Sequence, residues 1–192
     1  MSPLQVAAKF GQNETRAAME RVASPEERLL LACHIADADA ARAIVAAHPG
    51  IVERLGPVDR QALTDEAWNA NAPAVELMLE LGFDPSVPST SGPKGGTALH
   101  CAAWEGSVAC VAPMLRRPAG RALLEARDPN YGGTPLSWCS HGSANCGNPK
   151  ADHATVARML IAAGTPLYPE MADWEGSDAF MAVIDEALRG LR

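Results

Sequence analysis

The sequence predicts an all-α fold made of helical hairpins that repeat along the chain. Three observations support this class: an alanine-rich composition, a segment that recurs at offsets of 34 to 37 residues in the last four of its five copies, and glycine- and proline-rich connections. Of the 192 residues 36 are alanine, the strongest helix former, and its small side chain lets helices approach closely. With 47% hydrophobic residues, the chain is long enough to fold as one domain over residues 1–192.

The recurring segment is clearest as T-A-L-H-C-A-A-W-E-G at residues 97–106. It returns as T-P-L-S-W at residues 134–138 and as S-P-L-Q-V-A-A at residues 2–8. Two weaker copies lie between, aligned through Trp68 and His34 at offsets of 36 and 34 residues. Apolar residues at i, i+3 and i+4 after each copy predict a second helix. A single hairpin cannot bury its apolar face alone, so the hairpins are expected to stack.

The pattern divides the chain into five repeats and a closing helix. The repeats are expected at approximately residues 2–26, 27–60, 61–96, 97–133 and 134–170. Ser24-Pro25-Glu26-Glu27 predicts a helix start, because serine caps it, proline suits its first position and glutamate completes a capping box. The closing helix is expected over residues 177–189, with Ser177 as its cap.

The motifs T-A-L-H-x-A-A-x-x-G, T-P-L and S-P-L-Q-x-A-A resemble the ankyrin repeat, whose period is about 33 residues. The likeness spans nearly the whole chain, but it is weaker at residues 27–30 and 61–64, where E-R-L-L and Q-A-L-T replace T-P-L-H. A stretch at residues 141–152 is similar to a loop of bacterial ankyrin-like proteins. The resemblance implies an ankyrin-repeat solenoid of helix-turn-helix units, with short β-hairpin loops and a C-terminal capping helix.

The same resemblance implies a non-catalytic module that binds a protein partner through the concave face of the solenoid. That face consists of loop tips and the exposed residues of the first helices. The expected contact residues are Phe10, His34, Trp68, Asn69, Trp104, Glu105, Tyr131 and His141. Exposed aromatic side chains are frequent energetic anchors of interfaces. Trp68 and Trp104 could equally pack on each other between adjacent repeats, and the two roles are compatible.

The last repeat carries about eight extra residues between its two helices, in a Cys- and His-rich insertion at 138–153. Cys139, His141, Cys146 and His153 are donor types that zinc accepts, and Cys146 is a possible nucleophile. A metal-dependent or thiol enzyme is therefore the alternative function. The order C-x-H-x₄-C-x₆-H departs from common zinc-ligand spacing, so we favour a core Cys139 in a loop held by Asn and Ser hydrogen bonds.

Charge and hydropathy restrict the partner and the compartment. The chain has 16 Lys+Arg against 23 Asp+Glu, a net charge of −7, which disfavours a nucleic-acid partner. No apolar run approaches the roughly 20 residues of a membrane span, and no secretory signal pattern opens the chain. Five dispersed cysteines fit a reducing compartment. We expect a cytoplasmic monomer, and no cofactor, since no G-x-G-x-x-G or P-loop motif occurs.

Overall fold

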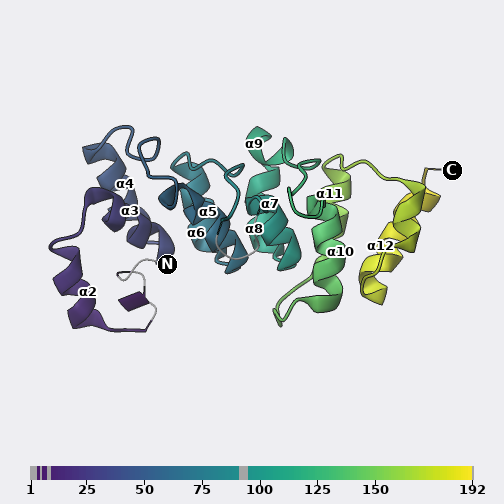
Figure 1. The fold of residues 1–192 in the computed structure, drawn as a ribbon, viewed down its shortest axis with the longest axis horizontal. Helices are drawn as coiled ribbons and strands as arrows, with labels where there is room; N and C mark the ends of the chain where they lie inside the picture. The colour runs from purple at the N-terminus through teal and green to yellow at the C-terminus, as the bar shows by residue number, and fades with distance from the viewer. Residues whose placement is uncertain (1–3, 5, 8–9, 91–94, 192) are drawn as a thin grey trace.

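The computed structural model describes residues 4, 6, 7, 10–90 and 95–191, so the first residues of the first predicted repeat lie outside the described part. Helices joined by turns and loops make up this part, and no strand occurs among the described residues (Figure 1). The predicted all-α class is confirmed.

Successive helices pair into hairpins along the chain. The α-helices are α2 (Asn13–Glu20), α3 (Pro25–His34), α4 (Ala38–Ala47), α5 (Ala62–Trp68), α6 (Ala72–Glu80), α7 (Ala98–Trp104), α8 (Val108–Leu115), α9 (Pro118–Arg121), α10 (Pro135–Asn145), α11 (His153–Ala162) and α12 (Asp178–Arg189). Two 3-10 helices are η1 (Asp59–Gln61) and η2 (Pro169–Asp173). The pairs α3–α4, α5–α6, α7–α8 and α10–α11 each pack together.

The turn after the first helix has the same backbone in four successive copies. Its central residue is left-handed, with φ of 66° at Gly11, 55° at Ala36, 52° at Ala70 and 59° at Gly106. In each copy the next residue donates its N–H to the carbonyl five positions earlier, over 2.8–3.0 Å. This bond satisfies a carbonyl that the helix end leaves unpaired, so each first helix stops at the same place.

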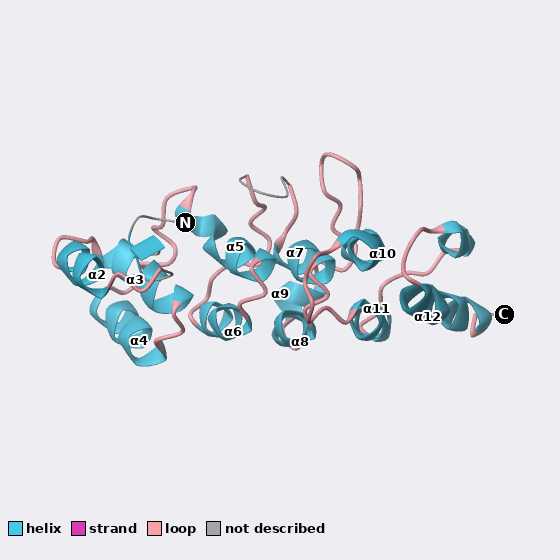
Figure 2. Cartoon of the chain, turned by 90° about the horizontal axis from the view of Figure 1, so that it is seen from below, coloured by secondary structure: helices cyan, strands magenta, loops and turns pink. Residues whose placement is uncertain are grey.

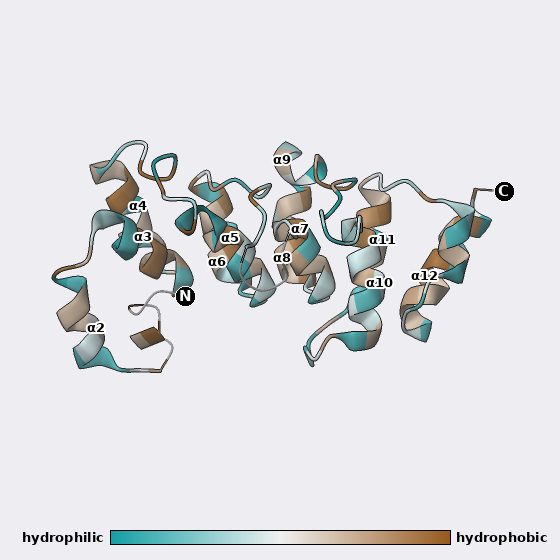
Figure 3. Cartoon of the chain, in the orientation of Figure 1, coloured by the Kyte–Doolittle hydropathy of each residue, from teal (hydrophilic) through white to brown (hydrophobic). Residues whose placement is uncertain are grey.

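The hairpins stand side by side in two layers (Figure 2). The first helices α5, α7 and α10 contact one another in order, and so do the second helices α6, α8 and α11. Four leucines at corresponding positions, Leu29, Leu63, Leu99 and Leu136, are completely buried between the layers. Apolar residues, brown in Figure 3, recur on each successive hairpin. One core therefore runs through all the hairpins.

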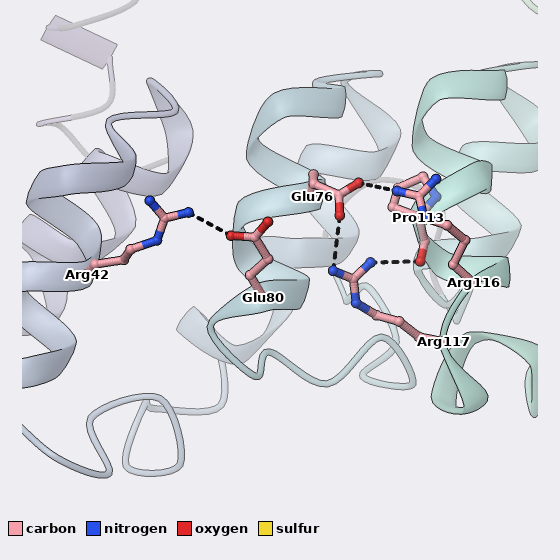
Figure 4. Close-up of polar contacts among 6 residues, drawn as sticks. All are labelled: Arg42, Glu76, Glu80, Pro113, Arg116 and Arg117. Atoms are coloured by element: carbon pink, nitrogen blue, oxygen red, sulfur yellow. Dashed lines mark hydrogen bonds and ion pairs between the residues drawn. The ribbon is translucent and has the colours of Figure 1, made fainter.

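Ion pairs link neighbouring second helices on their outer side (Figure 4). Arg42 of α4 pairs with Glu80 of α6 over 2.8 Å. Glu76 of α6 pairs with Arg116 over 2.6 Å and with Arg117 over 3.0 Å, where α8 ends. Because Arg42 and Arg116 are more than half exposed, and Arg117 and both glutamates are also partly exposed, each pair contributes little on its own.

The expected short β-hairpins are not present among the described residues. The loop before α10 is closed by two backbone bonds, from the N–H of Asp128 to the carbonyl of Gly133 and from the N–H of Gly132 to the carbonyl of Asp128. The Asp128 carboxylate accepts hydrogen bonds from the backbone N–H groups of Asn130, Tyr131 and Gly133. In a longer β-hairpin these N–H groups would be available to pair with the opposite strand. The side chain thus closes the loop in place of strand pairing.

The predicted closing helix is present as α12. Ser177 caps it by accepting the N–H of Phe180, as the sequence indicated. Phe180, Val183 and Ile184 are buried against α10, α11 and η2. No helix in the described ranges has both the length and the apolar composition needed to cross a membrane.

Candidate functional site

Four rings from three neighbouring first helices contact one another in a row. Trp68 and Trp104 end α5 and α7, and their ring centroids stack at 6.0 Å with 27° between the planes. His141 of α10 lies 5.3 Å from Trp104, and Trp138 of α10 meets the same ring edge-on at 6.2 Å. We call Trp68, Trp104, Trp138 and His141 the aromatic row. The three tryptophans are partly exposed and His141 is exposed.

The row combines the two interpretations made from the sequence. Trp68 and Trp104 do pack on each other between adjacent hairpins, and both rings still reach the surface. Edge-to-face and offset aromatic pairs contribute about 0.5–1.5 kcal/mol beyond area burial, so the row also joins α5, α7 and α10. Contacts within the chain therefore set the geometry of the row.

Trp138 is the member that sequence reasoning missed. The repeat alignment places it opposite Cys101, which is fully buried, so the alignment gives no indication of a surface position. Its indole N–H donates to Asp128 Oδ2 over 3.0 Å, and its ring meets His100 edge-on at 5.2 Å. A tryptophan N–H usually has a hydrogen-bond acceptor. This requirement could have indicated that Trp138 lies near polar groups at the surface rather than in the apolar core.

Two expected contact residues stand apart from the row. Phe10 is 69% exposed in the turn after the first helical residues, and Tyr131 is 89% exposed at the tip of the loop before α10. The Tyr131 loop is nevertheless tied to the row, because Asp128 binds both the backbone N–H of Tyr131 and the indole of Trp138. Asp128 thus links the loop tip to α10.

His34 ends α3, but its side chain pairs inward. Its Nδ1 lies 2.7 Å from Glu66 Oε1, and the imidazole is only 15% exposed. The amide of Asn71 donates to the other carboxylate oxygen over 2.7 Å and to the His34 carbonyl over 2.9 Å. This buried polar cluster joins α3 to α5 and α6, so His34 belongs to the packing between hairpins, and no ring contact extends the aromatic row to it within the described residues.

Two carboxylates flank the row. Asp65 lies one turn before Trp68 on α5, and Glu105 directly follows Trp104. Burial raises the pKa of both carboxyls. For Asp65 the positive charge of the chain's N-terminus opposes this rise and Glu66 adds a smaller one, and for Glu105 the hydrogen bond from Cys146 opposes the rise. Burial raises the pKa of the Cys101 thiol, and the charges of Asp65 and Glu105 add to that rise.

The remaining expected residue, Asn69, acts on its own helix. It is exposed after α5, and its amide donates to the Asp65 carbonyl over 2.8 Å. Asn69 therefore satisfies an end carbonyl of α5 and stands beside Trp68 at the surface.

The insertion of the last repeat is folded and fastened to α7. The helix α10 has 11 residues where α7 has 7, so part of the insertion extends the helix. His153 Nε2 then donates to the Trp104 carbonyl over 2.8 Å, and the amide of Asn148 donates to the Glu105 carbonyl over 2.9 Å. The insertion thus satisfies the carbonyls at the end of α7, and the expected hydrogen-bonded loop is confirmed.

The Cys and His side chains of the insertion do not converge. No group of three or more His, Cys, Asp or Glu side chains within the described ranges is placed to hold a metal ion. Cys139 is fully buried and its thiol donates to the His153 carbonyl over 3.4 Å, as expected of a core residue. The His153 ring is hydrogen-bonded to the Trp104 carbonyl, and the His141 ring packs against the Trp104 ring in the aromatic row.

The thiol of Cys146 has the wrong environment for a nucleophile. Burial raises its pKa, the Glu105 carboxylate adds to the rise, and the N–H of Asn148 only partly offsets it. Reactive cysteines need the opposite shift, because the thiolate is the nucleophile. The other four cysteines are buried, and burial raises the pKa of Cys33 to about 12 and of Cys110 to about 11.

His100 joins its own hairpin to the next loop. It is fully buried, its Nδ1 accepts the N–H of Thr97 over 3.2 Å, and its Nε2 donates to the Gly133 carbonyl of the next loop over 3.1 Å. Burial lowers the pKa of His100, so the neutral ring is favoured. The histidine holds the Tyr131 loop against α7.

The chain matches no protein-family model and none of the curated proteins. The ankyrin resemblance inferred from the repeats therefore remains a proposal.

Proposed function

We propose that this chain is an ankyrin-like array of helical hairpins that binds a protein partner without catalysis. The binding face consists of the first helices α5, α7 and α10 together with the loop tip at Tyr131. In the solenoid that the resemblance implies, this is the concave face. The observation that carries the proposal is the aromatic row, which keeps four rings in contact across three hairpins while leaving them partly open to solvent.

Two physical arguments support this face. Tryptophan and tyrosine bury a large area at low cost in side-chain entropy, so they dominate the free energy of many interfaces. The rings are also held in place by one another and by Asp128. A surface ordered in advance loses little conformational entropy on binding, so more of its contact free energy appears as affinity.

A comparison of surface variants tests the proposal. The double variant Tyr131→Ser/His141→Ser alters two exposed side chains of the face, while Val58→Ser removes a similarly exposed apolar side chain, 76% exposed, from the loop before η1. Each protein is immobilised, incubated with extract of its native cells, and its bound proteins are quantified.

We expect one protein to be retained by the wild type and by Val58→Ser. The double variant should retain about tenfold less of it, which corresponds to a loss of about 1.4 kcal/mol in binding free energy. Helix content by circular dichroism must be equal in the three proteins. Equal retention by the double variant would show that the partner binds elsewhere.

A further inference from the structure

The layer of first helices is acidic, unlike the layer of second helices. No lysine or arginine occurs in α5, α7 or α10, whereas α5 carries Asp65 and Glu66 and Glu105 follows α7. The second layer contains Arg42 and the arginines at the end of α8, each paired with a glutamate. Among the described residues, negative charge is therefore concentrated beside the aromatic row, and the positive charge of the chain's N-terminus lowers the pKa of one of these carboxyls, Asp65.

Only two of these carboxylates are available to a partner. Glu66 is buried and bound to His34 and Asn71. Asp65 and Glu105 are partly exposed, and neither forms an ion pair with any residue that the structure describes. The Glu105 carboxylate has a weak contact of 3.8 Å from the Cys146 thiol.

The carboxylates and rings occur together on each helix. Residues three positions apart share one side of a helix, so Asp65 and Trp68 lie on the same side of α5. Trp68 has a ring contact only with Trp104 among the described residues. An aromatic ring beside a carboxylate attracts a cation through two interactions, one with the ring quadrupole and one with the negative charge of the carboxylate.

We propose that the aromatic row receives an arginine side chain of the partner protein, with the guanidinium on the Trp68 ring, and with Asp65 and Glu105 supplying the negative charge around it. This inference rests on the proposed function and specifies the chemistry of the partner. Arginine fits better than lysine, because its planar, weakly hydrated guanidinium stacks on aromatic rings and forms paired hydrogen bonds with carboxylates. The net charge of −7 draws the same basic segment toward the chain at long range.

Selection of a random peptide library on the immobilised full chain provides a defined probe. We expect the selected peptides to be enriched in arginine, and a synthetic selected peptide to lose about tenfold in affinity when that arginine is replaced by citrulline, which keeps the planar shape without the charge. Fluorescence anisotropy measures the affinity. In the variant Asp65→Asn/Glu105→Gln the same replacement should change affinity less than about twofold.

The control variant Asp39→Asn removes an exposed carboxylate from α4 in the other layer and should retain the full citrulline effect. Selected peptides without arginine enrichment, or with equal affinity for arginine and citrulline, would overturn the inference, and so would a library that yields no binder. Peptides that bind the Tyr131→Ser/His141→Ser variant normally would instead contradict the proposed face itself. The two failures are thereby distinguished.

Discussion

At the scale of single residues, Asp128 organises the Tyr131 loop. It is buried, and its carboxylate accepts four hydrogen bonds, from the N–H groups of Asn130, Tyr131 and Gly133 and from the indole of Trp138. The variant Asp128→Asn replaces one acceptor oxygen with a donor and leaves some of these N–H groups unpaired. We expect a loss of about 2–3 kcal/mol in the free energy of unfolding, measured by urea denaturation.

The same residue predicts a pH dependence. Burial alone would raise the pKa of Asp128, but the hydrogen bonds from Trp138, Tyr131, Asn130 and Gly133 outweigh it and hold that pKa below its usual value. Its contribution to stability is thus complete above the unfolded-state pKa of about 3.9 and is lost as pH falls through the folded-state pKa. Below about pH 4 the unfolding free energy of Asp128→Asn should fall less steeply than that of the wild type. Parallel pH profiles would refute this role.

The buried position of Cys139 was predictable from the sequence, because the repeat alignment places it opposite the core residue Ala102, and the structure confirms it. The inward pairing of His34 with Glu66 was not predictable, because it joins residues 32 positions apart through side-chain orientation alone. The alignment likewise could not predict the partial exposure of Trp138, because the corresponding residue of the preceding repeat, Cys101, is buried.

At the scale of elements, the close approach of α10 to α7 depends on Gly142. A Cβ at this position would collide with the Trp104 carbonyl oxygen, which belongs to the backbone and cannot move aside cheaply. We expect Gly142→Ala to lower the free energy of unfolding by about 2–4 kcal/mol. The matched control is Gly147→Ala in the same insertion, where an added Cβ meets no atom within 4 Å. Equal stability of the two variants in thermal unfolding would contradict this packing.

The helices themselves were predicted more reliably than the segments between them. The capping box of α3 forms as expected, with the N–H of Glu27 donating to Ser24 Oγ over 3.1 Å and the N–H of Ser24 to Glu27 Oε2 over 2.9 Å. The expected β-hairpins do not form in the described part, because Asp128 takes the backbone donors of its loop. The spacing of cysteines and histidines in the insertion could not show that α10 is extended.

At the scale of the whole molecule, apolar contact between neighbouring hairpins should matter far more than their ion pairs. Leu99 is completely buried in the shared core, and Leu99→Ala is expected to cost about 2–5 kcal/mol. Glu76 holds two arginines of the next hairpin but is 37% exposed, so Glu76→Gln is expected to cost less than about 1 kcal/mol. Urea denaturation of both variants checks this order. A larger loss for Glu76→Gln would mean that charge holds the array together.

The row of buried leucines was already implied by the offsets between the repeats, so the stacking order could be predicted from the sequence. Whether the rings at the ends of α5 and α7 face one another or the solvent could not, since both depend on the exact separation of the hairpins. In the structure Trp68 and Trp104 stack on each other, and both remain partly exposed to solvent. The face proposed for the partner is a product of the whole stack.

Site-specific photocrosslinking in the native cells tests most directly whether this face binds a partner. A photoreactive phenylalanine analogue replaces Tyr131 in one protein and Val58 in another, both highly exposed positions. The account predicts a discrete protein adduct after illumination for the Tyr131 position and none for the Val58 position. An adduct of equal yield at both positions, or at Val58 alone, would contradict it, and so would the absence of any adduct at Tyr131.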